Sequence, residues 1–185
     1  MMDADEASSD ETLMAALAAG DDDALRPLMD RWQVPLRAFL FRYLQNEHEA
    51  MELAQETFVR LHRHRARYRA GARFSTWMFQ IALNLARDRR RWWRLRRHED
   101  LDTMAGPADG GPTPDEAAVR AERVAEVRAA VAALPGHLRA VVILAEYERL
   151  PQVEIAAVEG ITVKAVETRL ARAREKLRKA LLAAG

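Results

Sequence analysis

The densest cluster of chemically functional side chains lies at residues 87–98, which read RDRRRWWRLRRH. Seven arginines, one aspartate and two adjacent tryptophans fall within these twelve residues. Guanidinium groups pair with phosphates and carboxylates and stack on aromatic rings. The run therefore suits a membrane-surface helix, a solvated charged face or a nucleic-acid reader, and the rest of the chain has to decide among the three.

Residue types for metal binding or catalysis are sparse. The chain has no cysteine, so disulfides and thiolate metal sites are excluded. His62 and His64 are two residues apart and point to different sides of a helix, which is a poor arrangement for a shared metal. No serine, histidine and carboxylate form a recognisable nucleophile setting. We therefore expect no metal, no cofactor and no catalytic residue, and we expect that the protein is not an enzyme.

The composition is typical of a soluble globular protein. Of the 185 residues, 49% are hydrophobic, which is enough to build one ordinary core or two small ones. The longest uninterrupted apolar run, at 140–145, is too short to span a bilayer. The acidic first twelve residues lack the basic and apolar segments of a signal peptide. A cytoplasmic protein without membrane insertion is the expectation.

Charge is distributed in alternating blocks that the net value of +1 conceals. Residues 1–30 carry a balance of −8 and residues 31–98 a balance of +11. Residues 99–126 return to −6, and residues 127–185 carry +4. Two basic segments, each preceded by an acidic one, indicate two surfaces that face a polyanion.

The segment 99–116 divides the chain. It reads EDLDTMAGPADGGPTPDE and holds three glycines and three prolines among acids, so it can neither propagate a helix nor bury a face. On either side the apolar spacing is helical and lacks the alternation of strands. We predict an all-α protein with two small helical domains, 1–98 and 117–185, which are joined only by a flexible acidic linker.

The N-terminal domain is predicted to contain helices at 10–19, 23–44 and 47–68. A fourth helix is predicted to run from Thr76 into the arginine-rich segment, with Ser75 as its N-cap. The apolar residues of the third helix should face the core. These residues are Met51, Leu53, Ala54, Phe58 and Leu61.

The C-terminal domain is predicted to contain helices at 117–134 and 137–149, followed by a short helix at 152–158 whose apolar residues include Val153. A turn at Gly160 follows, and Thr162 caps the last helix. One face of that helix should be buried: Val163, Val166, Leu170, Ala173 and Leu177. The opposite face should be open to a major groove: Lys164, Thr168, Ala171, Arg172 and Glu175.

A plain helical hairpin would give the same helix, glycine turn and helix. The charge of the last helix favours a helix-turn-helix that binds DNA, because residues 162–183 carry seven bases against two acids.

Four stretches together give the chain a family resemblance: ELAQETFVRLHRHRARYR at 52–69, FSTWMFQIALNLARDRRR at 74–91, ALPGHLRAVVILAEYERL at 133–150 and EIAAVEGITVKAVETRLARAREKLR at 154–178. In order and spacing they resemble the bacterial RNA polymerase sigma factors of the extracytoplasmic-function group, in the sigma-70 family. The resemblance implies a factor that binds core polymerase and directs promoter-specific initiation. Region 2 would occupy 1–98 and region 4 would occupy 117–185.

The resemblance also implies roles for individual residues. Core polymerase would be bound by Glu52, Gln55 and Glu56. The single-stranded −10 element would be bound by Gly71, Ala72, Arg73, Phe74, Asn84, Arg87, Arg90 and Arg91. The duplex −35 element would be bound by Lys164, Glu167, Thr168, Arg169, Ala171, Arg172 and Arg174. An anti-sigma factor is a further implied partner.

Three positions and two other functions stay open at this level. Many relatives have a base where this chain has Glu167, so the −35 sequence preference is open. Trp92 and Trp93 could pack on the domain or lie against duplex DNA. A stand-alone helix-turn-helix regulator, or a helical protein that binds membranes or RNA, remains as an alternative function.

Overall fold

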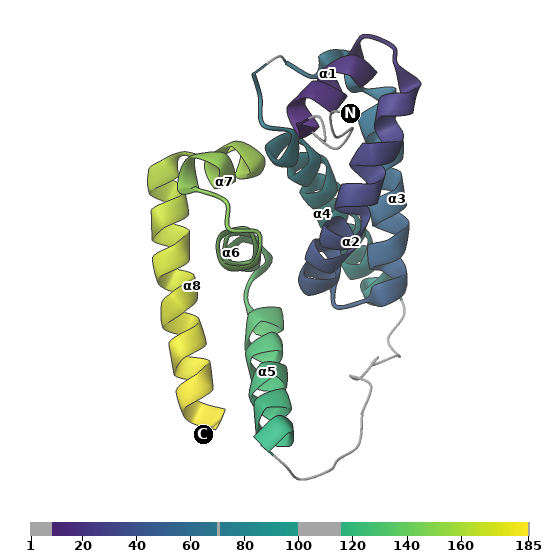
Figure 1. Ribbon diagram of the computed structural model, residues 1–185. Helices are drawn as coiled ribbons and strands as arrows, with labels where there is room; N and C mark the ends of the chain where they lie inside the picture. Colours follow the sequence, from purple (N-terminus) through teal and green to yellow (C-terminus); the bar gives the residue numbers. More distant parts are fainter. Residues whose placement is uncertain (1–8, 70, 100–115, 185) are drawn as a thin grey trace.

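The computed structural model describes residues 9–69, 71–99 and 116–184, and every regular element in those ranges is helical (Figure 1). The predicted all-α class is confirmed. The N-terminal helices are α1 (Asp10–Ala18), α2 (Leu25–Leu44), α3 (Glu47–Arg63) and α4 (Phe74–Glu99). The C-terminal helices are α5 (Glu116–Ala133), α6 (Gly136–Val142), α7 (Gln152–Glu159) and α8 (Val163–Ala184). The shorter segments are η1 (Asp22–Ala24), η2 (Arg65–Arg67) and the π-helical η3 (Ile143–Tyr147).

The predicted linker at 99–116 falls, apart from its two end residues, outside the described residues. Its two ends belong to α4 and α5.

Aromatic side chains fill the core between α1, α2 and α4. Phe39, Phe74 and Phe79 have almost no exposed surface. The ring centroids of Phe39 and Phe79 are 4.9 Å apart, and Trp32 meets the edge of Phe74 at 5.9 Å. Such edge and tilted contacts add to the free energy of burial, so these rings fix how α4 lies against α2.

The predicted inner face of α3 is largely confirmed. Its buried residues include Leu53, Ala54, Phe58 and Leu61. The prediction for Met51 is wrong, because 46% of this residue is exposed. Met51 instead lines an open groove between α2 and α3 together with Met29, Val34 and Val59. The two helices leave room there that no other described helix covers.

The two predicted N-caps have different outcomes. Thr162 caps α8 as expected, since its hydroxyl oxygen accepts a hydrogen bond from the amide of Ala165 at 3.2 Å. Ser75 is not the cap of α4, because that helix already begins at Phe74. The amide of Phe74 donates to the carboxylate of Glu11 at 3.3 Å, so a side chain from α1 satisfies this helix start.

Helices α7 and α8 form the predicted helix-turn-helix. Gly160 ends α7 with a φ of 66°, a left-handed conformation that glycine adopts without strain. On α8, Val166, Leu170 and Ala173 are buried. The apolar predictions for Val163 and Val153 are wrong, because these residues are 39% and 64% exposed. Both lie on the outward sides of the short motif, where no described helix packs.

The two helical groups pack directly against each other. Helix α7 lies beside the start of α4 (Figure 1). Helix α2 also contacts α5, α6 and η3. The expectation that only the linker joins the two domains is therefore wrong. Arg139 of α6 illustrates the contact, because it is 6% exposed and donates a 2.7 Å hydrogen bond to the carbonyl oxygen of Tyr43 in α2. Burial, together with the nearby Arg90 guanidinium, lowers the pKa of Arg139 to about 10.

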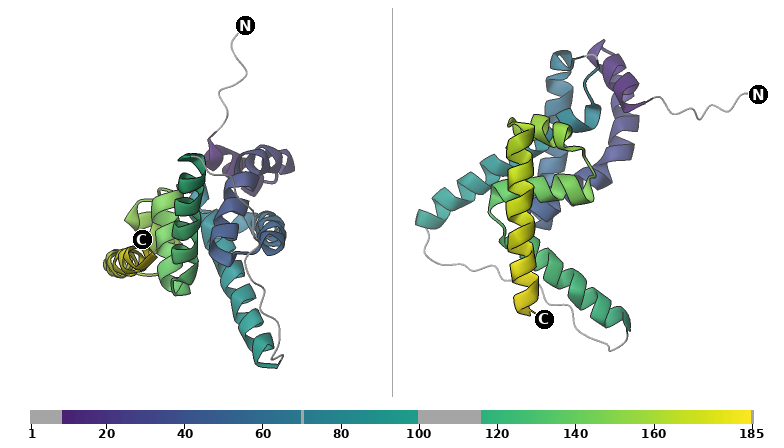
Figure 2. Two further views of the ribbon diagram at one scale, coloured as in Figure 1. Left: turned by 90° about the horizontal axis from the view of Figure 1, so that it is seen from below. Right: turned by 90° about the vertical axis from the view of Figure 1, so that its left-hand side faces the viewer.

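The C-terminal end of α4 projects beyond both groups (Figure 2). Trp93, near this end, packs against the core, whereas Trp92 is 47% exposed and carries the guanidinium of Arg96 at 4.2 Å from its ring centroid. The two adjacent tryptophans therefore have different surroundings.

We predict that Trp93→Ala lowers the free energy of unfolding by roughly 1–3 kcal/mol, since it removes a partly buried ring. Trp92→Ala should cost less than about 1 kcal/mol, the range of an exposed cation–π contact. Urea unfolding of each variant measures both values. Equal losses would contradict the different packing of the two rings.

A second prediction concerns Glu148, whose side chain is 10% exposed and lies 3.4 Å from Arg42 of α2. Burial raises the pKa of Glu148 to about 6, and the Arg42 charge opposes this only in part. A raised pKa means that the folded state binds the proton more tightly, so stability should fall as the pH rises from 4.5 to 6. The change should be on the order of 1 kcal/mol after solvent screening.

Urea unfolding at pH values across this window, for the wild type and Glu148→Gln, measures the effect. The variant should lack this component of the pH dependence. An identical slope in both proteins would contradict the assignment to Glu148.

Candidate nucleic-acid interface

Several arginines in the basic half of α4 form ion pairs with carboxylates of the same chain. Arg87 lies 2.6 Å from Glu159 of α7, and Arg89 pairs with Glu49 and with Glu52 of α3. Arg91 lies 2.9 Å from Asp88 one turn earlier on the same helix. These arginines are held by carboxylates in positions that phosphates could also take, because both anions accept paired guanidinium hydrogen bonds.

Arg90 has a different environment. Its guanidinium lies 5.4 Å from the ring centroid of Tyr43, and its Nη1 is buried without a hydrogen-bond partner in the structure. The same nitrogen is close to Gly136 of α6, where a Cβ would lie only 3.2 Å from it. Arg90 thus faces the C-terminal helices as well as its own domain.

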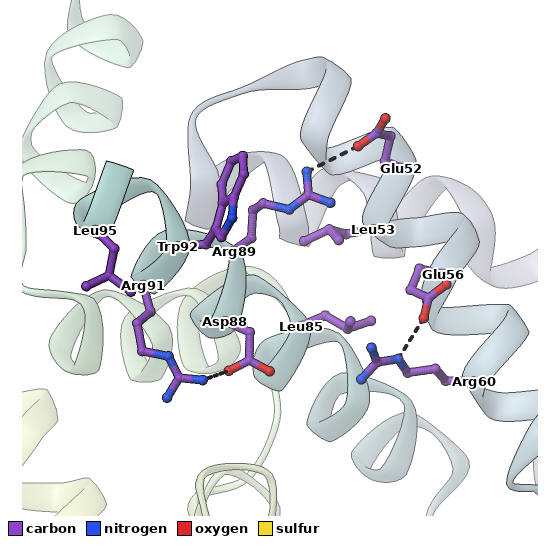
Figure 3. Close-up of a pocket in the computed structure, with 10 residues that line it drawn as sticks. All are labelled: Glu52, Leu53, Glu56, Arg60, Leu85, Asp88, Arg89, Arg91, Trp92 and Leu95. Carbon is purple, nitrogen blue, oxygen red and sulfur yellow. Dashed lines mark hydrogen bonds and ion pairs between the residues drawn. The ribbon is translucent and has the colours of Figure 1, made fainter. Parts of the chain in front are cut away.

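A groove of about 670 Å³ runs between α3 and the basic half of α4 (Figure 3). Glu52 and Glu56 line one wall, and Trp92 and Leu95 line the other. Leu53 and Leu85 lie between these two walls. Glu52 and Glu56 therefore share one concave surface with apolar and charged parts.

Gln55 does not share this groove. It lines the separate apolar groove between α2 and α3 that also contains Met51. Residues 52 and 56 lie one turn apart on one face of α3, whereas residue 55 points to the neighbouring face. The three residues expected to bind polymerase are thus divided between two adjacent surfaces.

The loop before α4 is braced by local contacts. Gly71 has a φ of 86°, which favours glycine, and the hydroxyl of Tyr68 donates to the carbonyl oxygen of Ala72. Arg73 is 70% exposed at its side chain and lies 3.3 Å from Glu154 of α7. The expectation that Phe74 contacts the −10 element needs a correction, because this side chain is fully buried and has no surface that DNA could reach. It supports the loop from the core side instead.

The outward face of α8 is open. Lys164, Thr168, Ala171 and Arg172 are all exposed. Glu167 lies 2.9 Å from Lys164, and the Glu167 carboxylate raises the pKa of that ammonium.

Arg174 and Arg169, the residues of α8 expected to contact DNA phosphates, differ in how exposed their side chains are. Arg174 extends from α8 to Glu146, also at 2.9 Å, and its side chain is 65% exposed. Arg169 is partly covered and lies 2.5 Å from Glu159. Within the described residues the reading face is therefore accessible, while both arginines beside it are paired and Arg169 is the more covered of the two.

Sequence reasoning missed that acidic residues of α7 form ion pairs with arginines of other helices. Glu159 is 1% exposed at its side chain and joins arginines from α4 and α8, and Glu154 joins α7 to the start of α4. Each acid lies beside apolar residues on a short helix, and this local pattern does not indicate an ion pair with another helix. Only the packing of the two helical groups shows which charges they meet.

No described helix is long and apolar enough to cross a membrane. Among residues 9–69, 71–99 and 116–184, no group of three or more histidine and carboxylate side chains is placed to hold a metal ion.

Family models match both halves of the chain. Sigma-70 region 2 matches residues 28–97, and sigma-70 region 4 matches residues 125–177. The sigma factor SigW of Bacillus subtilis is 32% identical over 172 residues, which cover 88% of this chain and 91% of SigW. CnrH of Cupriavidus metallidurans is 32% identical over 176 residues, with 91% of this chain and 92% of CnrH covered.

A solved structure of CnrH in complex with the cytosolic domain of CnrY has the same fold, with a TM-score of 0.73 at 30% identity. The match covers 95% of this chain and 99% of that one. Both groups of helices and their order are therefore shared with a sigma factor. The chain belongs to the sigma-70 family and, within it, to the extracytoplasmic-function sigma factors of RNA polymerase.

Proposed function

We propose that this sigma factor, which directs promoter-specific initiation of transcription, binds core polymerase through α3 and reads promoter DNA through α4 and α8. The observation that carries the proposal is the open, polar and basic face of α8 behind a capped turn. It lies in a chain whose other half matches the region that accompanies it in sigma factors.

The polymerase contact rests on Glu52 and Glu56. Their side chains are 45% and 38% exposed, and their arginine partners lie at 3.2 Å and 2.7 Å. Exposed ion pairs contribute little, about 0–1 kcal/mol, so a basic partner surface can replace these arginines at small cost. Because Gln55 lies in the adjacent groove, the partner has to cover the ridge between the two surfaces.

The double variant Glu52→Arg, Glu56→Arg should lower the affinity for core polymerase at least about tenfold, because like charges would then meet across the interface. A fluorescence titration of the labelled full-length chain with core polymerase measures this. Asp23→Arg, on an exposed residue near the other end of α3, is the control and should bind as the wild type does. Equal losses in both proteins would contradict a local contact.

The −35 element would be read as duplex DNA. Thr168, Ala171 and Arg172 present a hydroxyl, a methyl group and a guanidinium, which match the donor, acceptor and methyl pattern of the major groove. Lys164 and Arg174 at either end of this set would hold phosphates, and Arg169 would do so once released from Glu159.

We expect Glu167 to change which base the protein prefers at one position of the −35 element. Its carboxylate can accept a hydrogen bond from cytosine, and its pairing with Lys164 keeps the local charge near zero. We predict that Glu167→Lys changes the preferred base at one −35 position and leaves the others unchanged. Selection from a randomised −35 duplex library measures the preference, with Glu122→Lys on α5 as control. An unchanged profile would remove Glu167 from the reading set.

The −10 element would be bound as an opened strand. Gly71 and Arg73 are exposed and Ala72 is partly buried in the loop at one end of α4, and Asn84 is exposed further along the helix. A base extruded from the stack needs a pocket whose contacts offset a few kcal/mol of unstacking. Further phosphate contacts would come from Arg87, Arg90 and Arg91.

The remaining features fit a regulated initiation factor. We infer that it has no catalytic activity of its own and acts in the cytoplasm, where its polymerase is. CnrH, at 30% identity, takes the cytosolic domain of CnrY as a partner, so we infer that an anti-sigma factor binds this chain as well. A stand-alone regulator would leave α2, α3 and α4 without a role, and the similarity to sigma factors over 88% of the chain gives that alternative no support.

A further inference from the structure

A positively charged cavity lies between α2, α4 and α6. It has a volume of about 260 Å³ and is lined by Tyr43, Arg87, Arg90, Arg94, Gly136 and His137. Three of these residues are arginines, and in the part of the chain that the structure describes no lining residue is acidic. The cavity therefore concentrates positive charge without a carboxylate in its wall.

Two of the three arginines have no counter-ion among the described residues. Nη1 of Arg90 is buried and has no hydrogen-bond partner there. Arg94 and His137 are exposed, and neither forms an ion pair with another described residue. Arg87 differs, because it lies 2.6 Å from Glu159. A buried donor without an acceptor costs free energy, so an acceptor that enters the cavity would gain by satisfying Arg90.

Another guanidinium lies near the cavity. Arg139 of α6 is 6.0 Å from the centroid of the Tyr43 ring, and Arg90 is 5.4 Å from the same centroid. Arg139 donates its hydrogen bonds to backbone carbonyl oxygens, so no carboxylate accompanies it. Burial, and to a smaller extent the charge of Arg90, lowers the pKa of Arg139 to about 10. The two guanidinium groups repel each other, and an anion beside Arg90 would offset that repulsion.

Glycine at position 136 keeps space open beside two donors. A Cβ at this position would lie 3.2 Å from Nη1 of Arg90 and 3.2 Å from the hydroxyl oxygen of Tyr43. Both donors therefore approach one small space that a larger side chain would fill. The neighbouring His137 adds an imidazole N–H, which either tautomer provides.

We propose that this cavity binds the phosphate or diphosphate group of a small anion, held by Arg90, Arg94 and His137 together with the Tyr43 hydroxyl. A phosphate group presents oxygens in several directions, so it can accept hydrogen bonds from α2, α4 and α6 at once. The cavity is slightly smaller than the roughly 300–1,000 Å³ of pockets for drug-sized ligands, a size that suits a small anion and is too small for a DNA duplex.

Arg90 is also among the residues proposed to contact the −10 strand. A bound anion would compete with that strand for Arg90, and this consequence alone rests on the proposed function. Binding of the anion itself requires neither DNA nor polymerase, so it is measured on the free chain.

The test titrates the full-length chain with pyrophosphate by isothermal calorimetry. Sodium chloride holds the ionic strength constant, because salt screens exposed charges. Arg94→Gln removes one charge from the wall, whereas Gly136→Ala adds a methyl group beside Arg90 and leaves the charge unchanged. Arg178→Gln, on an exposed arginine of α8, is the matched control for the loss of one charge. A second titration with ADP shows whether a nucleotide can supply the diphosphate group.

One pyrophosphate should bind per wild-type chain. Arg94→Gln and Gly136→Ala should each weaken binding at least about fivefold, since each loses or displaces a charge-assisted hydrogen bond. Arg178→Gln should bind as the wild type does. Pyrophosphate should also raise the melting temperature of the wild type and this control more than that of the two variants, because a ligand of the folded state stabilises it. If Gly136→Ala does not fold, as judged by circular dichroism, Arg94→Gln on the exposed residue decides.

The absence of saturable binding of both pyrophosphate and ADP to the wild type would overturn the proposal. Unchanged affinity in Arg94→Gln would do so too, as would an equal loss in Arg178→Gln, because binding would then depend on total charge and not on this cavity. Binding of pyrophosphate by a chain that supports no promoter-specific transcription would uphold the site and count against the proposed function.

Discussion

The rest of the structure depends on the arginines in the basic half of α4, because their charges have to be satisfied by other groups. The apolar half of this helix is fixed in the N-terminal core by Phe74 and Phe79, so the arginines that follow are carried in a set direction. Guanidinium groups stay charged, and a carboxylate is the strongest hydrogen-bond acceptor that a partly buried one can find in the chain. Without DNA, the partners are carboxylates on α3 and α7.

The same constraint explains why the two helical groups are not independent. Helix α7 supplies the carboxylates for α4 and is also the first helix of the motif that presents α8. Contacts between α2 and α6 reinforce the arrangement through the buried guanidinium of Arg139, which satisfies the carbonyl oxygen of Tyr43. The surfaces proposed for polymerase and for the −35 duplex remain open, while part of the −10 surface is covered.

Sequence reasoning was strongest where a pattern is local. The spacing of Ala54, Phe58 and Leu61 is enough to identify a buried face, and Thr162 caps its own helix. It failed where distant residues decide. Met51 lines a groove between α2 and α3 and does not enter the core, and the amide of Phe74, where α4 begins, donates to Glu11 of α1. The part played by Glu159 depends on how two domains dock, which no local spacing encodes.

The assignment as an initiation factor is tested most directly by transcription in vitro. Core polymerase would be supplied with a library of genomic fragments, with and without the purified full-length chain, and the transcript start sites would be mapped. The account predicts a set of starts that require the chain and share two upstream sequence elements at a fixed spacing. Identical start sites with and without the chain would contradict it.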